Sequence, residues 1–570
     1  MTVTSFLRRL DARIQTQESR IQKREGTRKW GNEDLDPTPV EERTWRHWNY
    51  FMFFWAVSFN PNQWNTGSSL VNQGLKWWQA LLSIAVGNLL CSVVLVVQSR
   101  GPAVYHIGYP AFVRASAGMF GSLWFIFLRG CVAIIYFATQ TFYAGKLFDV
   151  MLRCAFGHNW QDIPNHLPES AGITTRGLAA FFLYWAIQLP FMLIHPQRAK
   201  WLYTIKSVIA PPVLIAVFGY VVGKNGGLSG SSQITKTSTT TVLGWAFMNG
   251  INSVCGSISP EIMSNADLAR YAKKPSDAAW AQAVGIFTSK TFVIFMGIAC
   301  SSASLNLWGT AYWNMWDLLG AILDHNWNAG ARTAIFLVCL IQALAVMATN
   351  LASNCLPVGA DLTGLFPRYF NIPRGQVFCA VISLAVVPWK LQASAQTFLT
   401  FLGSYVVFIA PVIAVMIVDY WIVRKGNIHV PSLYDDSPDS PYYYWKGFNL
   451  RMFAAWVAGV VIVIHGLAGN YNPHFNQASK DMYTMGFILA SLTGGLVYYI
   501  LVRIWPIVPY PADRRGMPKT LEFLGRTDGY FEDDVIDGIS SGHHQQEAFA
   551  EKMMPPPNEK DVAHTFTSLA

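Results

Sequence analysis

The stretch Trp55-Ala-Val-Ser-Phe-Asn60-Pro61-Asn62-Gln63-Trp64-Asn65-Thr66-Gly67-Ser68-Ser69-Leu70 interrupts an apolar helical pattern that begins near Phe51. Pro61 lacks a backbone N–H, and amide side chains and a glycine cluster around it, so a continuous membrane helix is not expected here. Backbone groups freed inside a bilayer persist only where protein, water or a ligand satisfies them, which is how carriers build substrate and ion sites. The stretch therefore indicates a broken membrane helix that lines a binding site.

The composition places the chain among polytopic membrane proteins. Of its 570 residues, 52% are hydrophobic and only 13% are charged, and the mean hydropathy is +0.26. These values are too apolar for a soluble protein of this length. The formal charge of +9 comes without a basic groove carrying interleaved aromatic residues, so a nucleic-acid partner is not expected. The expected partners are a small-molecule substrate and the membrane lipids.

The chain carries no signature of an enzyme. Its eight cysteines lie mostly in apolar runs without paired-ligand spacing, so neither disulfides nor a zinc site is expected. Motifs of metalloproteases, serine hydrolases and phosphate-binding loops are absent from the sequence. We therefore expect no catalysis, no metal and no cofactor. A membrane receptor that does not transport is the outside alternative.

A hydropathy scan predicts an all-α protein with twelve membrane spans, each long enough to cross about 30 Å of hydrocarbon. The spans lie at residues 49–70, 77–98, 122–150, 176–195, 201–223, 242–264, 281–305, 332–356, 376–392, 396–423, 450–468 and 483–504. Basic residues fall in the segment before the first span and in alternate loops after it, so both termini are expected in the cytoplasm.

Polar tails flank the predicted spans. Residues 1–45 are rich in charge and lack the apolar core of a cleavable signal peptide, so we expect them to be retained as a cytoplasmic tail. Residues 506–570 contain proline and acidic runs that predict a disordered cytoplasmic tail. Both tails are candidates for contact with trafficking or ubiquitylation machinery.

A second interruption lies in the sixth span, in Asn249-Gly-Ile-Asn-Ser-Val-Cys-Gly256-Ser-Ile-Ser-Pro260-Glu261. Breaks in the first and sixth spans predict a LeuT-like inverted repeat of five plus five helices, at about 46–223 and 242–423. The alternative is that Pro and Gly serve helix packing alone. Glu261 is costly in mid-membrane unless it pairs, titrates or meets a cation. It is therefore a candidate to carry a coupled proton or to balance a cationic substrate.

Two further spans carry polar faces. Tyr136 and Gln140 are one helical turn apart and combine a ring with an amide, which suits a flat polar ligand. The alternative is a glutamine that joins two helices. In the eighth span, Asn350 and Asn354 share a face, next to small residues and Thr349. That face is expected to meet either the substrate or an ion.

Six segments resemble the nucleobase:cation symporter-1 family, and more narrowly its fungal Fur-type branch of uracil, allantoin and uridine permeases. They are Asn32-Glu-Asp-Leu-Asp-Pro37, Gly108-Tyr-Pro-Ala-Phe-Val-Arg114, Asp267-Leu-Ala-Arg-Tyr271, Phe366-Pro-Arg368, Pro388-Trp-Lys390 and Val418-Asp-Tyr-Trp-Ile-Val-Arg424. The resemblance implies a plasma-membrane symporter that imports uracil, allantoin, uric acid or related nucleobase-like compounds by alternating access. The same branch includes carriers similar to thiamine and nicotinamide riboside permeases, so vitamin or nucleoside transport is the alternative.

The resemblance also implies a set of ligand contacts. The family's substrate positions fall on Asn60, Tyr136, Gln140, Ser257, Ile258 and Asn354, and Asn350 lies on the same polar face as the last of these. Ile258 departs from the family pattern, because a tryptophan usually stands there. We therefore expect one of two stacking rings to be replaced by an aliphatic surface.

The family's sodium site falls on Ala56, Phe59, Ala345, Ala348 and Thr349. Only Thr349 keeps a hydroxyl, so the resemblance implies coupling to protons rather than to sodium, with Glu261 as the first candidate for the titrating group.

Charged residues at the span ends are candidates for structural pairs and for a gate. Asp361 and Asp419 are expected to pair with Arg368 or Arg424. Arg129 lies near the inner end of the third span and is expected to pair with Asp34 or Asp36 as an inner gate. A simple topology anchor is the alternative for Arg129.

Overall fold

The structure is a computed structural model that describes residues 15, 30–31, 34–193, 200–228, 240–472, 474–531 and 534, without the side chains of 200–203 and 240–242. Most of the expected N-terminal tail, and the C-terminal tail after residue 534, lie outside this description. Every named element of the described residues is a helix or helical turn, and these residues form no β-strand, only two isolated bridges.

Ten long helices form the body of the molecule. They are α5 (Trp77–Tyr105), α7 (Gly121–Phe156), α9 (Thr175–Gln188), α10 (Lys200–Lys224), α11 (Thr240–Ser264), α13 (Trp280–Trp308), α15 (Ala329–Thr349), α19 (Ala395–Ile417), α20 (Leu450–Tyr471) and α22 (Gly486–Ile504).

Shorter helices connect and flank these. They are α3 (His47–Ser58), α4 (Pro61–Asn72), α6 (Tyr109–Ala117), α8 (His158–Gln161), α12 (Ala266–Ala269), α14 (Met315–His325), α16 (Leu356–Leu365), α17 (Ile372–Ile382), α18 (Pro388–Leu391) and α21 (Gln477–Thr484). Two π-helical turns, η4 (Asn350–Cys355) and η6 (Val418–Val423), continue α15 and α19.

Within the described residues, nine helices are long and apolar enough to cross a membrane. They contain α5, α7, α9, α10, α13, α15, α19, α20 and α22. The expected first, sixth and ninth spans correspond to α3 with α4, to α11 and to Ile372–Val386, which lie outside that set. The count of twelve spans therefore stays a prediction.

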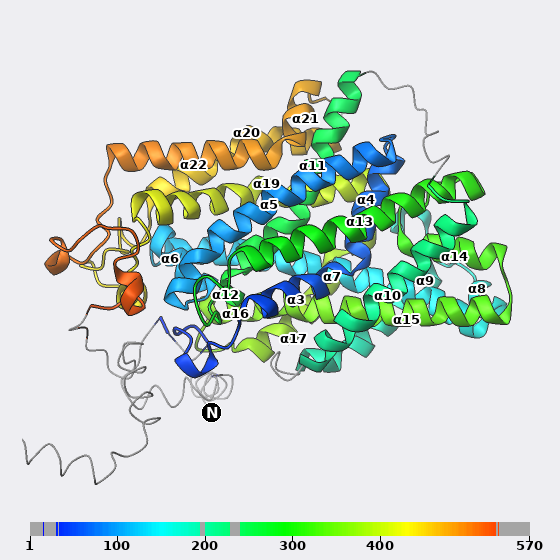
Figure 1. Ribbon diagram of the computed structural model, residues 1–570, viewed down its shortest axis with the longest axis horizontal. Helices are drawn as coiled ribbons and strands as arrows, with labels where there is room; N and C mark the ends of the chain where they lie inside the picture. The colour runs from blue at the N-terminus through cyan, green and yellow to red at the C-terminus, as the bar shows by residue number, and fades with distance from the viewer. Residues whose placement is uncertain are drawn as a thin grey trace, which may run out of the picture.

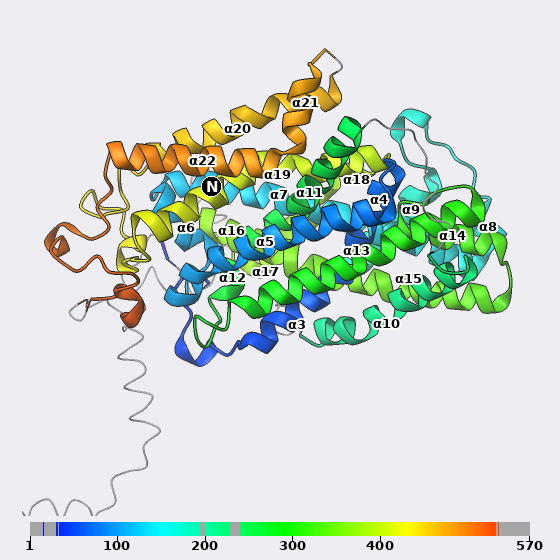
Figure 2. The ribbon, with the colours of Figure 1, turned by 45° about the horizontal axis from the view of Figure 1, so that its top comes forward.

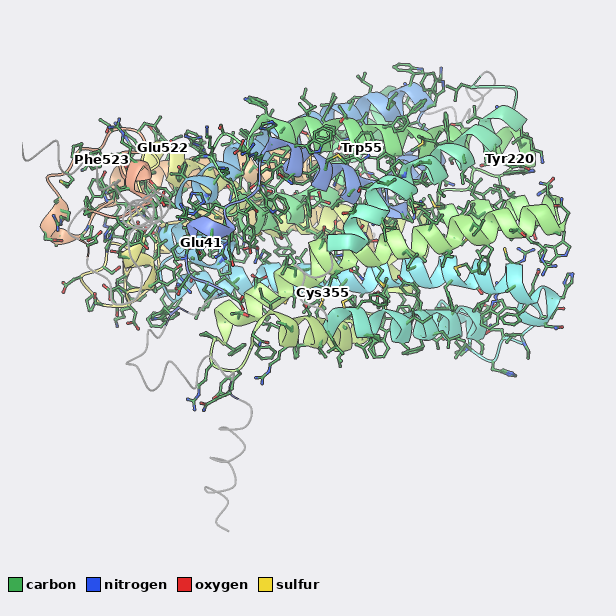
Figure 3. All side chains as sticks on the ribbon, turned by 60° about the horizontal axis from the view of Figure 1, so that its bottom comes forward. Glu41, Trp55, Tyr220, Cys355, Glu522 and Phe523 are labelled. Atoms are coloured by element: carbon green, nitrogen blue, oxygen red, sulfur yellow. The ribbon has the colours of Figure 1, made fainter. Side chains whose placement is uncertain are left out.

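The long helices lie side by side along the long axis of the molecule (Figure 1). Helices α20 and α22 pack against each other and against α19 at one edge, while α13 packs on α3, α4 and α5 (Figure 2). Glu41 and Glu522 lie toward one end and Tyr220 toward the other, with Trp55 and Cys355 between them (Figure 3). Helix α3 and turn η4 therefore meet the rest of the bundle in its middle part.

Helices α3 and α4 are separated by a residue with an extended backbone. Asn60 has φ −148° and ψ 142°, and its side-chain oxygen accepts a hydrogen bond of 2.9 Å from the backbone N–H of Asn62. This contact caps α4. Pro61 opens α4 at a position where a backbone N–H has no intrahelical partner. The polar side chains that follow are buried, and α4 as a whole packs on α13.

Helix α11 is continuous, which corrects the expected break in the sixth span. It runs from Thr240 to Ser264 as one α-helix with Pro260 inside. Gly256 serves helix packing, because a Cβ at this position would collide with the backbone carbonyl of Leu402 in α19. Pro260 has no N–H to donate to the Gly256 carbonyl four residues earlier. That carbonyl instead accepts a hydrogen bond of 3.3 Å from the Tyr136 hydroxyl of α7.

The described part of the C-terminal tail packs on the body of the protein. Glu522 accepts two hydrogen bonds from the Arg100 guanidinium at 2.8 and 2.7 Å and a third from the Tyr420 hydroxyl at 3.0 Å. Asp528 pairs with Arg43 at 2.7 Å. These contacts hold the tail against α5, η6 and the N-terminal segment. The expectation of disorder from residue 506 is therefore wrong for residues 506–531.

Candidate functional site

A small polar cavity lies where α3 gives way to α4. Its volume is about 20 Å³, which is room for roughly one water molecule. It is lined by Val57, Asn60, Asn62, Gln63, Tyr136, Gln140, Ser257, Pro260, Glu261, Thr349, Ser353 and Asn354. The first break, α7, α11 and the end of α15 with η4 thus converge on one point. Most of the side chains predicted to contact substrate lie in this lining.

The face of α7 contributes a ring and an amide. The Tyr136 ring lies 4.7 Å from the Tyr405 ring, centroid to centroid, with the planes inclined at 34°. Among the described residues, the Gln140 side-chain oxygen has no hydrogen-bond partner although it is buried. The same is true of the Asn60 side-chain nitrogen. Two amide residues of the lining, Gln140 and Asn60, therefore carry a buried acceptor and a buried donor without a partner.

Turn η4 sets the polar face of the eighth span. The Asn354 amide nitrogen donates to the Asn350 side-chain oxygen at 2.9 Å. Asn350 in turn donates to the Phe137 carbonyl and to the Thr141 hydroxyl, both at 3.2 Å. Asn350 is therefore committed to holding α7 and does not line the cavity, whereas Asn354 does. π-Helical turns of this kind are frequent at functional sites, and the sequence pattern gave no sign of one here.

The two α11 positions implied by the family resemblance have different surroundings. The Ser257 hydroxyl lines the cavity and accepts hydrogen bonds from Asn62 at 3.4 Å and from Gln63 at 3.5 Å, which joins α4 to α11. Ile258 is fully buried in the apolar core and is not part of the lining. The assignment of Ile258 to the substrate surface is therefore corrected, since one residue along a helix is about 100° around it.

A charged pair stands at the edge of the cavity. The Glu261 carboxylate lines the cavity, and its two oxygens lie 2.9 and 2.8 Å from the Lys290 ammonium. Lys290 is fully buried in α13. The sequence marked Glu261 as needing a partner or a titration role, and the structure supplies the partner.

A second lysine stands at the positions that match the family's sodium site. The Lys206 ammonium of α10 donates to the Thr349 hydroxyl, which itself donates to the Ala345 carbonyl at 3.0 Å. Ala56, Phe59 and Ala348 are buried and do not line the cavity. Lys206 was missed in the sequence, although a charged residue inside an apolar span is a signal for function.

Arg129 forms a network with two acidic side chains, and not with the N-terminal segment. Its Nε lies 3.0 Å from each Asp361 oxygen, and one terminal nitrogen lies 2.6 Å from Asp267. The backbone carbonyls of Asp34 and Asp36 instead accept hydrogen bonds from Arg270. The expected pairing of Arg129 with Asp34 or Asp36 is therefore wrong, because α12 and α16 already supply two carboxylates to its guanidinium.

The expected pairing of the other acidic residues holds in one of two cases. Asp361 pairs with Arg129 and not with the expected Arg368. Asp419 pairs with Arg424 at 2.8 Å, as expected.

Comparison with known proteins gives consistent matches. A family model described as "Permease for cytosine/purines, uracil, thiamine, allantoin" matches residues 37–490. The allantoin permease of Saccharomyces cerevisiae is 32% identical over 84% of this chain and 76% of that protein. The uracil permease of the same yeast is 33% identical over 76% of this chain and 69% of that protein.

The fold is also matched by a solved structure. Mhp1, a nucleobase-cation-symport-1 family transporter in a closed conformation with bromovinylhydantoin bound, has a TM-score of 0.65 at 21% identity. The match covers 85% of this chain and 99% of Mhp1. At this identity the similarity establishes the fold, which is the helical transporter fold expected from the sequence.

Proposed function

Because this chain belongs to the family of permeases for cytosine/purines, uracil, thiamine and allantoin, we propose that it is a proton-coupled importer of nucleobases or related amides such as uracil, allantoin or uric acid. The family consists of transporters and not of enzymes. The choice of cargo is supported by relatives named allantoin and uracil permeases. The transport cycle would be alternating access around the cavity at the first break.

The pair of unused amide atoms carries the proposal. Uracil and the hydantoin ring of allantoin each present an N–H next to a C=O on one edge. The N–H would donate to the free oxygen of Gln140, and the C=O would accept from the free nitrogen of Asn60. A buried polar atom without a partner costs about 1–3 kcal/mol. A ligand that bonds both the Gln140 oxygen and the Asn60 nitrogen therefore stabilises the closed site relative to the same site closed without ligand or water. The Tyr136 ring offers a stacking surface of about 1–3 kcal/mol.

The cavity must enlarge to take such a ring, since about 20 Å³ is too small for it. A wider polar cavity of about 510 Å³, lined by Asn72 and Gln73 among others, lies near the start of α5. Arg100 and the tail that binds it lie near the other end of α5. Arg129 likewise joins α7 to α12 and α16. We interpret this arrangement as a carrier whose inner side is closed.

Proton coupling is favoured over sodium coupling by the contacts of Thr349. Its hydroxyl is the one side-chain oxygen kept among the five sodium-site positions, and the Lys206 ammonium already donates to it. A sodium ion 4 Å from that ammonium would be repelled by about 4 kcal/mol at an effective dielectric constant of about 20. Glu261 remains the candidate for the titrating group, because it lines the cavity and its buried partner Lys290 can give up a proton when the carboxyl gains one, which leaves no uncompensated ammonium.

Uptake measurements test both parts of the proposal. Cells that lack other carriers for these compounds and express the full chain should accumulate labelled uracil or allantoin. Accumulation should collapse with a protonophore and persist when external sodium is replaced. Sodium-dependent accumulation that survives the protonophore would reject protons as the coupling ion. Absence of uptake for every amide tried would reject nucleobase-like amides as the substrate class.

The proposed location is the plasma membrane, with both termini in the cytoplasm. The alternating basic loops of the sequence support this orientation. Microscopy of a fluorescent fusion, together with protease protection of a tag at each terminus, tests it. A tag cleaved from outside intact cells would contradict the orientation.

A further inference from the structure

Three charged side chains of the described residues stand at the cavity. Glu261 is part of the lining, and Lys290 holds its carboxylate at 2.8 and 2.9 Å. Lys206 binds the hydroxyl of Thr349, which also belongs to the lining. The other residues that line the cavity are uncharged at neutral pH. The electrostatic character of the site therefore depends on one carboxylate and two ammonium groups.

The net charge of these three side chains is positive or zero in nearly every protonation state. With all three ionised, one negative charge faces two positive charges. Protonation of Glu261 makes the site more positive, and loss of one lysine proton brings it only to zero. A negative site would require both lysines to be neutral while Glu261 stays ionised, although Glu261 is in direct contact with the ammonium of Lys290.

Glu261 is consequently not available as a counter-ion for a cationic ligand. A positively charged ring would have to displace Lys290 from the carboxylate, and the Lys290 side chain is fully buried. Displacement would leave an uncompensated buried ammonium, which is strongly unfavourable. The ring would also approach the ammonium of Lys206 at Thr349, where like charges repel.

We infer that the cargo is a neutral or anionic amide and that the site excludes permanent cations. The inference rests on the proposed function and narrows its substrate class. Uracil and allantoin are uncharged at neutral pH, and uric acid is an anion. Thiamine and nicotinamide riboside both carry a fixed positive charge, so this chain discriminates against them although the family description includes thiamine.

Competition for uptake tests the inference. Cells that lack other carriers and express the full chain are given labelled uracil or allantoin, with unlabelled uracil, allantoin, urate, thiamine or nicotinamide riboside as competitors. We expect at least one of the first three to inhibit, and both cations to require a concentration at least about 100-fold higher. Inhibition by thiamine or nicotinamide riboside at similar concentrations would overturn the inference and leave the transporter proposal intact. Uptake of no amide would overturn both.

Variants of the Glu261–Lys290 pair provide a second, independent test of the inference. Lys290→Met leaves Glu261 without its partner, so inhibition by thiamine should become at least about tenfold stronger. Lys290→Arg keeps the positive charge and should keep the exclusion of thiamine. The double variant Glu261→Gln/Lys290→Met removes both charges. Because Glu261 is the proposed proton-carrying group, the variants are compared by competition for binding of the labelled amide to the purified protein, and there the double variant should exclude thiamine again. If thiamine competes with the labelled amide on the double variant as strongly as on Lys290→Met, an unpaired Glu261 is not what admits the cation. Surface labelling measures the amount of each variant at the membrane.

Discussion

Replacing Gln140 by leucine should weaken amide uptake while leaving the protein folded. Leucine has a similar size and fills the same place on α7, but it removes the free side-chain oxygen that lines the cavity. A ligand N–H that donates to this oxygen would then be buried without a partner, at a cost of about 1–3 kcal/mol. Since about 1.4 kcal/mol corresponds to a factor of ten, we expect the KM for uracil or allantoin to rise by about 5- to 150-fold.

The assay is initial-rate uptake of the labelled amide over a range of concentrations, normalised to the amount of protein at the cell surface. Thr139→Val is the matched control, because Thr139 is the neighbouring residue on α7 and, among the described residues, its hydroxyl donates only to the Ile135 carbonyl, at 2.9 Å. It does not line the cavity. The control should keep the KM within about twofold. An unchanged KM in Gln140→Leu, or an equal rise in both variants, would refute the assigned role of Gln140.

Three further predictions concern stability. Arg129→Ala removes the guanidinium that pairs with Asp361 and Asp267. The thermal stability of the purified protein should therefore fall by the equivalent of about 3–5 kcal/mol, and an unchanged Tm would show that these ion pairs do not stabilise the fold. Gly256→Ala places a Cβ against the Leu402 backbone and should lower the Tm, whereas Gly219→Ala, with nothing within 4 Å of the new Cβ, should leave it unchanged or raise it; equal effects would contradict the packing role of Gly256. Burial alone would raise the pKa of Glu522, but hydrogen bonds and charge from Arg100, with the Tyr420 hydroxyl, hold it below its usual value. The stabilising contact is therefore present above the unfolded pKa and lost as pH falls through the folded one, so Glu522→Gln should flatten the acid side of the Tm profile, and a parallel profile would contradict this.

The class of protein and the central residues of the cavity lining can be predicted from residue types that lie close together in the sequence. Pro61 and the amides around it predict both a helix boundary and a polar lining, and the structure has Asn60 extended between two helices. One-turn spacing likewise brings Tyr136 and Gln140 to the same cavity. These inferences depend only on neighbours along one helix.

The rest of the site depends on contacts between helices, which periodicity does not specify. Gly256 and Pro260 are residues typical of a helix break, yet α11 is continuous. Gly256 allows close packing on Leu402, and the Tyr136 hydroxyl bonds the Gly256 carbonyl that Pro260 leaves without an N–H donor. The partners of Arg129 could not be chosen from sequence, because several carboxylates lie near the same end of the spans. Lys206 lies in an apolar span, and only the packing of α10 on α15 brings it to Thr349.

The most direct test is transport by the purified full chain in sodium-free proteoliposomes with an inward proton gradient. We expect labelled uracil or allantoin to accumulate, accumulation to end when the gradient is dissipated, and Gln140→Leu to require a higher substrate concentration than Thr139→Val. Accumulation driven only by a sodium gradient, or equal behaviour of the two variants, would contradict the proposed function.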